Sequence, residues 1–175
     1  METNIQELKL NLRQSNIKYV KVAITDIDGV LRGKYMHVDK FLKSIESGYG
    51  FCDVIFGWDS SDDLYEFKIS DEQNLFTGWH TGYPDQIVRI ILDSQRTIPF
   101  ESNTPFFLSE LKDGEVCPRN ALKKTLNLLK ELGFEGKSAL EYEFFLFNET
   151  PHSVREKGFQ NLASITPGMF GYSML

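Results

Sequence analysis

Two glutamates, Glu141 and Glu143, stand one residue apart inside the apolar stretch SALEYEFFLF. Aromatic side chains and leucines on most of its positions predict a buried strand over residues 138–147. Side chains two apart on a strand share a face, so the carboxylates would lie roughly 6.6 to 7 Å apart. Adjacent carboxylates repel each other and lose hydration in an apolar strand, which predicts a divalent-metal site. The alternative is a strand at a domain edge that exposes both glutamates to water.

A second pair of acids, Asp26 and Asp28, follows an apolar stretch in VKVAITDIDGVLRGK. An apolar strand that ends in D-x-D-G resembles the first motif of the haloacid dehalogenase-type phosphatases. In that interpretation Asp26 is the nucleophile, Asp28 is the general acid, and Mg²⁺ lies between them and the phosphate. The other interpretation is a β-hairpin with Asp-Gly at its tip. The order of elements favours the hairpin, because the phosphatase fold needs repeating β-α-β units.

Two further patterns predict no chemistry. The stretch GFEGKS (residues 133–138) resembles a phosphate-binding loop, but only two residues separate its glycines and it lies between a helix and a following strand. It is interpreted as the turn that ends a helix. His37, His80 and His152 lie in separate polar contexts and are interpreted as surface or loop histidines.

The elements that must position these residues form a mixed α+β pattern. The periodicity of apolar residues predicts helices over residues 4–15, 39–48 and 118–133, and strands over residues 18–25, 30–38, 85–93 and 138–147. Asp39 is the predicted cap of the second helix, and Pro118 suits the first turn of the third. Residues 49–84 are predicted to be rich in loops. The prolines within residues 97–108 predict an irregular or edge-like segment.

The composition excludes several classes of protein. The chain has 175 residues, 41% of them hydrophobic, with a net charge of −6 and a pI of about 5.1. The acidic balance argues against a nucleic-acid partner, and no run approaches the roughly 20 apolar residues of a membrane span. The first residues lack the order of a signal peptide. Cys52 and Cys117 have no metal-type spacing, so we expect free thiols and a cytoplasmic protein.

Four stretches, taken in their order along the chain, resemble motifs of the glutamine synthetase superfamily. They are ITDIDGVLRGK (residues 24–34), WDSSD (58–62), CPRNALKK (117–124) and EYEFFLF (141–147). The closing TPGMFGYSML is similar to the segment that follows in the family's non-housekeeping members. Its apolar residues from Met169 to Leu175 predict a poorly soluble chain.

The resemblance implies an α+β chain, with a β-grasp-like domain over residues 15–112 and the truncated start of an α/β catalytic domain over residues 113–175. It implies that Glu141 and Glu143 bind catalytic Mg²⁺ or Mn²⁺ ions, Glu143 on the amino-acid side and Glu141 toward the phosphates of ATP. Asp59 would help to bind and deprotonate ammonium across an interface in a homo-oligomeric ring. The implied reaction joins ammonia or an amine to glutamate through γ-glutamyl phosphate, with ATP as co-substrate.

The chain departs from the family pattern in three places. The family's catalytic domain is far longer than residues 113–175, so we expect an amino-terminal fragment that is inactive alone. The acidic loop reads D-S-S-D instead of D-G-S-S, and a solvated acidic turn is its other interpretation. Cys117 stands where an aspartate would cap a helix. Two alternatives stay open: a phosphatase that uses Asp26 and Asp28, and a non-catalytic β-grasp interaction protein.

Overall fold

The computed structural model describes residues 5–65, 76–114 and 116–166. The chain divides into two compact units, Met1–Gly136 and Lys137–Leu175, each of which is taken by itself below. The apolar end from Met169 to Leu175, on which the solubility prediction rests, lies outside the described residues. The predicted domain boundary between residues 112 and 113 stays a prediction.

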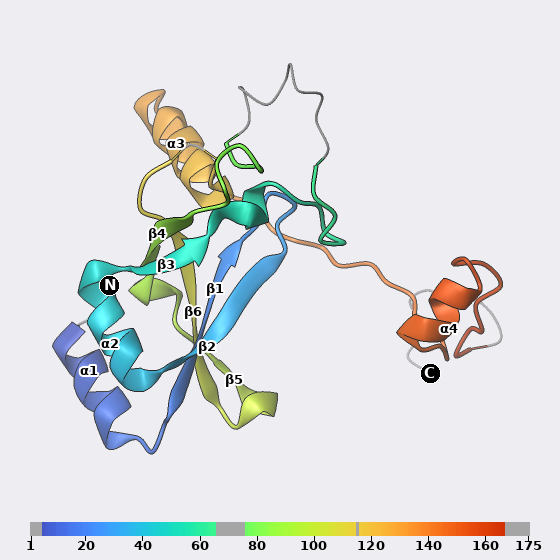
Figure 1. The fold of residues 1–175 in the computed structure, drawn as a ribbon, viewed down its shortest axis with the longest axis horizontal. Helices are drawn as coiled ribbons and strands as arrows, with labels where there is room; N and C mark the ends of the chain where they lie inside the picture. Colours follow the sequence, from blue (N-terminus) through green and yellow to red (C-terminus); the bar gives the residue numbers. More distant parts are fainter. Residues whose placement is uncertain (1–4, 66–75, 115, 167–175) are drawn as a thin grey trace. The chain divides into compact units, whose positions relative to one another are not determined.

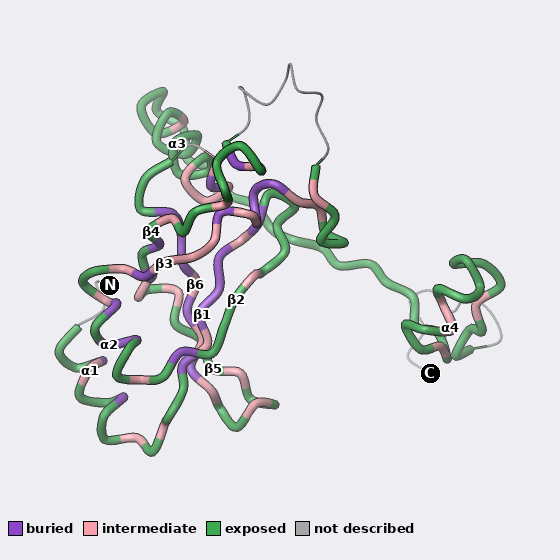
Figure 2. The backbone as a smooth tube through the Cα atoms, viewed as in Figure 1, coloured by how far each residue is buried: buried purple, intermediate pink, exposed green. Residues whose placement is uncertain are grey.

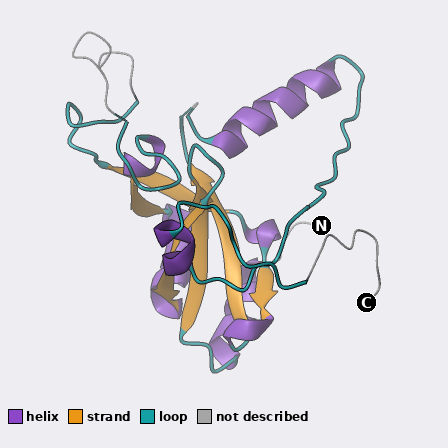
Figure 3. Cartoon of the chain, turned by 90° about the vertical axis from the view of Figure 1, so that its right-hand side faces the viewer, coloured by secondary structure: helices purple, strands orange, loops and turns teal. Residues whose placement is uncertain are grey.

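The first unit is built on one mixed sheet (Figures 1 and 3). Its strands are β1 Tyr19–Thr25, β2 Leu31–His37, β3 Tyr49–Cys52, β4 Asp85–Ile90, β5 Arg96–Ile98 and β6 Thr104–Leu111. Their order is β2-β1-β6-β4-β3, and β5 pairs with β6. The central strands β1 and β6 are parallel, and the other pairs are antiparallel.

The helices confirm the α part of the predicted α+β class. They are α1 Ile5–Gln14, α2 Val38–Ser47, α3 Pro118–Glu131 and, in the second unit, α4 Pro151–Glu156, with short 3₁₀ turns η1 Asp53–Phe56, η3 Leu92–Ser94 and η4 Pro99–Glu101. The first three α-helices begin and end within two residues of their predicted limits. Among the helices in the described ranges, none is both long and apolar enough to cross a membrane.

The core lies between the sheet and the first two helices. Val20, Val22 and Ile24 alternate along β1 and are completely buried, as their spacing predicts. Phe41 of α2 packs on Phe107 of β6, with ring centroids 4.8 Å apart. Figure 2 shows the buried positions running along β1 and β6. This core fixes the β1–β2 hairpin that carries Asp26 and Asp28.

Two sequence predictions about the first unit are wrong. The segment predicted as irregular or edge-like, residues 97–108, contains the first five residues of β6, which lies inside the sheet between β1 and β4. Its Pro105 pairs only with β5, because the pairing of β6 with β1 begins at Phe106, so the missing N–H breaks no bond to β1. The cap of α2 is His37, whose Nδ1 accepts the backbone N–H of Asp39, instead of the predicted Asp39 side chain.

Helix α3 is attached to the sheet by charge. Glu110 on β6 is completely buried and accepts hydrogen bonds from Arg119 and Lys123 of α3 and from Arg89 of β4. No described side chain of α3 is buried, and Leu122 is 59% exposed. The apolar residues whose periodicity predicted this helix, Leu122 and Leu126 among them, are therefore exposed in the described part of the chain.

The second unit contains α4, which the sequence reasoning missed. Thr150 and Ser153 form a capping box at its start. Glu149 accepts hydrogen bonds from the backbone N–H of Ala163, from Lys157 and from Ser153. These hydrogen bonds lower the pKa of Glu149 to about 2, the backbone N–H of Ala163 contributing most.

Candidate functional site

The hairpin between β1 and β2 turns on Asp26, the residue after β1. Its Oδ1 accepts hydrogen bonds from the backbone N–H groups of Asp28 at 3.0 Å and Val30 at 2.8 Å. Its Oδ2 accepts a hydrogen bond from Arg32 Nε at 2.8 Å. The side chain is completely buried, and both oxygens are engaged in hydrogen bonds within the fold. Gly29 has a φ of 84°, as an Asp-Gly hairpin tip requires, and the hairpin prediction is confirmed.

Residues 58–63, called the acidic turn below, fold around Asp59. Its Oδ1 accepts the backbone N–H groups of Ser61 at 2.7 Å and Asp63 at 3.1 Å. The backbone N–H of Asp59 donates to the carbonyl of Asp63 at 3.0 Å, and Asp62 adopts a φ of 67°. An aspartate that caps its own turn in this way has a fixed side-chain direction. Where the Asp59 carboxylate points is therefore determined by where the acidic turn lies.

Arg32 joins the acidic turn to the hairpin. Besides its bond to Asp26, it donates from Nη1 to Asp62 Oδ1 and from Nη2 to the carbonyl oxygen of Asp59, the latter at 3.3 Å. Its guanidinium carbon also lies 5.1 Å from the ring centroid of Trp58. Cation–π contacts and charge-assisted hydrogen bonds both favour arginine at such a junction. Two motifs that lie apart in the sequence are thus brought together.

The surroundings of the acidic turn are electronegative. Burial raises the pKa of Tyr65, and the negative charges of Asp28, Asp59 and Asp26 raise it further. Arg32 is paired with Asp26 and Asp62, which leaves the carboxylates in excess. A cluster of negative charge with aromatic neighbours attracts small cations such as ammonium or an alkylammonium ion.

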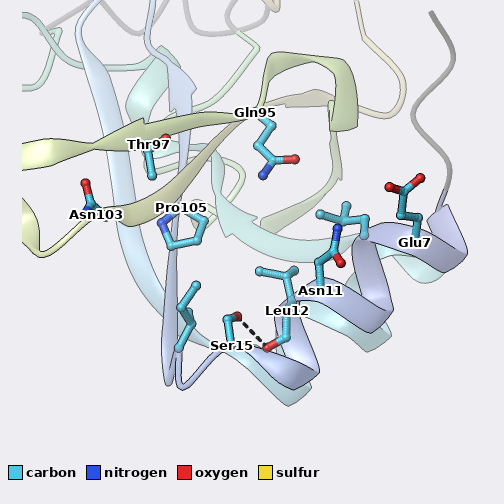
Figure 4. Close-up of a pocket in the computed structure, with 10 residues that line it drawn as sticks. Glu7, Asn11, Leu12, Ser15, Gln95, Thr97, Asn103 and Pro105 are labelled. Carbon is cyan, nitrogen blue, oxygen red and sulfur yellow. Dashed lines mark hydrogen bonds between the residues drawn. The ribbon is translucent and has the colours of Figure 1, made fainter.

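A separate hollow of about 390 Å³ lies between α1 and the β5–β6 hairpin (Figure 4). Among the described residues that line it, Glu7 is the one charged side chain, and the other polar ones are neutral: Asn11, Ser15, Gln95, Thr97 and Asn103. None of the predicted site residues lines this hollow. Its described lining holds no cluster of carboxylates, histidines or cysteines, so we do not take it as the candidate site.

The predicted strand over residues 138–147 is wrong. Within this stretch only Phe147 pairs, in an isolated bridge with Ser164. Residues 138–145 run as an extended coil, and Tyr142 is 79% exposed (Figure 1). A strand needs a neighbour for its backbone hydrogen bonds, and the described residues provide none for residues 138–145.

Glu141 and Glu143 lie in that coil, and both are exposed. Neither carboxylate has a hydrogen-bonding or ionic partner among the described residues. Their oxygens are the kind of donor that Mg²⁺ and Mn²⁺ prefer. In the described parts of the chain, no group of three or more His, Cys, Asp or Glu side chains is arranged to hold a metal ion. The donor type fits the predicted metals, and the role of Glu141 and Glu143 as metal ligands stays a prediction.

The phosphatase alternative is not favoured. Its nucleophile would be Asp26, yet that carboxylate is buried and both of its oxygens accept hydrogen bonds. A nucleophile must reach the phosphorus atom. The three histidines, His37, His80 and His152, form no metal cluster in the part of the chain that the structure describes.

Arg32, within the motif LRGK, is a functional residue that the sequence alone did not single out. A signal was present, since an apolar strand that ends in a buried aspartate needs a cation close by. Arg32 lies six residues after Asp26, across a hairpin turn. The position of the acidic turn beside this arginine had no comparable signal, because it depends on contacts between distant segments.

Three comparisons relate the chain to known proteins. Residues 115–172 match the family model described as glutamine synthetase, catalytic domain. Type-1 glutamine synthetase 2 of Dictyostelium discoideum is 44% identical over 178 residues, which cover 98% of this chain and 33% of that protein. Glutamate–isopropylamine ligase of Pseudomonas sp is 31% identical over 182 residues, which cover 99% of this chain and 38% of that ligase. The chain therefore spans about a third of the length of these relatives.

Among solved structures, the cryo-EM structure of Plasmodium falciparum glutamine synthetase resembles this chain with a TM-score of 0.51 and 21% sequence identity. The match covers 75% of this chain and 23% of that one. An identity this low indicates a shared fold and nothing about activity.

Proposed function

Because the chain belongs to the glutamine synthetase superfamily, we propose that it is part of an ATP-dependent ligase acting on glutamate. In the proposed reaction the side-chain carboxylate of glutamate takes the γ-phosphoryl group of ATP and releases ADP. Ammonia or an amine then attacks the γ-glutamyl phosphate, forms the amide bond, loses a proton and displaces inorganic phosphate. The name of the Pseudomonas relative supports an amine as one possible acceptor.

The observation that carries this proposal is the ordered acidic turn beside Arg32. Asp59 is half-buried, its direction is set by two backbone N–H groups, and its surroundings are electronegative. We propose that Asp59 binds the ammonium or alkylammonium ion and accepts its proton. A cation held by a carboxylate becomes a nucleophile only after it loses a proton, and a nearby carboxylate can take that proton.

Glu141 and Glu143 are the proposed metal ligands. Two exposed carboxylates without described partners support this role, and their oxygens suit Mg²⁺ or Mn²⁺. Glu143 would hold the ion on the side of the amino-acid substrate, and Glu141 the ion toward the ATP phosphates. When bound, the metals would stabilise the negative charge that moves between phosphate oxygens. The other ligands and the nucleotide pocket are not among the described residues, so we expect the 175 residues alone to be inactive.

The finer points of architecture are also proposals. A β-grasp arrangement for residues 15–112 is supported by a β1–β2 hairpin, the helix α2, and a last strand parallel to β1 at the centre of the sheet. We further propose a homo-oligomeric ring in the cytoplasm, in which Asp59 completes the site of a neighbouring subunit.

The proposal is tested on the protein expressed from its complete reading frame. Phosphate release is measured with ATP, glutamate, Mg²⁺ and either ammonia or a series of primary amines. Asp59→Asn should raise the KM for the amine about tenfold or more, with Asp63→Asn as the matched control one turn away. No glutamate-dependent phosphate release with any acceptor would overturn the ligase assignment. Phosphate release by the isolated 175 residues would overturn the expectation that they are inactive.

The metal ligands are tested by binding instead of turnover. Mn²⁺ binding is followed by electron paramagnetic resonance in the complete protein and in its Glu143→Gln variant. The variant should bind Mn²⁺ about tenfold more weakly or worse, whereas the exposed control Glu135→Gln should match the wild type. Equal Mn²⁺ affinity in all three proteins would remove Glu143 from the metal site.

A further inference from the structure

Arg32 makes more polar contacts than the hairpin alone requires. Nε, Nη1 and Nη2 donate to three different residues: Asp26, Asp62 and Asp59. Only 17% of the side chain is exposed, and its guanidinium also packs beside the ring of Trp58. Three of these four partners belong to the acidic turn, so most of the contacts of Arg32 are with that turn.

We propose that Arg32 is a positioning residue that places the acidic turn, and with it the Asp59 carboxylate, for binding the amine. The inference rests on the proposed role of Asp59. Asp26 is the fixed end of the linkage, because its Oδ1 accepts two backbone N–H groups of the hairpin. From Asp26 the linkage runs through the guanidinium to Asp62 and to the backbone of Asp59.

The linkage requires the shape of arginine as well as its charge. A guanidinium presents its N–H groups in a rigid plane, whereas the ammonium of lysine is a compact point charge on a flexible stem. A lysine at position 32 can pair with Asp26 or with Asp62 but cannot span both while facing Trp58. Arg32→Lys therefore keeps the net charge of the site and removes the link between hairpin and turn.

Charge and position make opposite predictions for the loss of Arg32. If the arginine acted only through its charge, its removal would make the acidic turn more negative and would strengthen amine binding. If it positions Asp59, the carboxylate loses its place and amine binding weakens. Arg32→Lys separates the two roles, because a purely electrostatic role predicts no change in this variant.

The first test is hydrogen–deuterium exchange on the complete protein. In Arg32→Lys the backbone amides of Ser61 and Asp63 should exchange about tenfold faster or more, while those of β1 keep their wild-type rates. Asp62→Asn serves as a second variant. It leaves the hydrogen bond between Arg32 and Asp26 in place, so the test can still be read if Arg32→Lys fails to fold. Arg96→Lys, an exposed arginine on β5, is the matched control. Unchanged exchange in both test variants would overturn the inference.

The second test is the steady-state kinetics of the same proteins. Arg32→Lys should raise the KM for the amine about tenfold or more and change kcat by less than about threefold. If Asp59→Asn raises this KM and Arg32→Lys does not, the positioning role is overturned and the proposed function stands. If neither variant changes it, the role of Asp59 fails, and the inference that rests on it fails as well.

Discussion

Replacing Glu110 with glutamine is expected to lower the free energy of unfolding of the first unit by about 3 kcal/mol. Glu110 is completely buried and accepts hydrogen bonds from three cationic residues, Arg89, Arg119 and Lys123. A hydrogen bond to a charged group contributes about 1.5–3 kcal/mol. The cationic side chains are 31% to 53% exposed, and solvent screening reduces each contact to about 1 kcal/mol. Three contacts of this size sum to about 3 kcal/mol.

Urea unfolding followed by tryptophan fluorescence measures this loss, since Trp58 and Trp79 both lie in the first unit. With an m-value of about 1–3 kcal/mol per molar, the midpoint should fall by about 1–3 M. Glu101→Gln is the control: Glu101 also accepts hydrogen bonds from a lysine and a tyrosine, but it remains 27% exposed. Equal midpoint shifts in the two variants would refute the reasoning, because the burial of Glu110 would then add nothing to the stability that its hydrogen bonds provide.

The same carboxylate makes a prediction about pH. Burial alone would raise the pKa of Glu110, but the hydrogen bonds from Lys123, Arg89 and Arg119 outweigh it and hold the pKa below the ordinary value of 4.5. A carboxylate with a lowered pKa stabilises the fold fully above its unfolded pKa. The difference in stability between wild type and Glu110→Gln should therefore be constant above pH 4.5 and shrink as the pH falls through the lowered pKa.

Three other predictions follow from single positions. Glu149 should titrate with a pKa of about 2 in an NMR experiment, because the backbone N–H of Ala163 donates to it; its contribution to stability is then complete above pH 4.5 and is lost toward pH 2, and a midpoint near 4.5 would contradict this. Gly33→Ala should destabilise the first unit by about 1–3 kcal/mol in urea, because the new Cβ would lie 2.3 Å from a carbonyl oxygen of the neighbouring strand; an unchanged midpoint would show that the strands separate freely. Cys52 should react with a thiol reagent faster than the buried Cys117, and equal rates would contradict the burial of Cys117.

The sequence predicted those elements whose signals are local. The alternation of Val20, Val22 and Ile24 identified β1, and Asp-Gly identified the hairpin. Strand β6 was missed because Pro105 argues against a central strand unless the pairing of each residue is known. The stretch of residues 138–147 was predicted as a strand because its composition suits one, whereas pairing depends on a neighbour that composition does not specify.

The candidate site was predictable to a similar extent. The acidic character of residues 58–63 and the glutamate pair at Glu141 and Glu143 are visible in the sequence. The link from Arg32 to the acidic turn is not, because it joins segments 27 to 30 residues apart through side-chain geometry. The roles of Asp59 and of the two glutamates stay predictions until they are measured.

The charged attachment of α3 bears on the order in which the chain folds as it is synthesised. The sheet cannot close before β6 is made, since β6 supplies the parallel neighbour of β1. Glu110 lies near the end of that strand, and its partners in α3 follow only 9 and 13 residues later. Contacts this close in sequence form quickly once the chain leaves the ribosome. Because ion pairs form in the presence of water, we expect α3 to take its direction on the sheet while its exposed leucines are still hydrated.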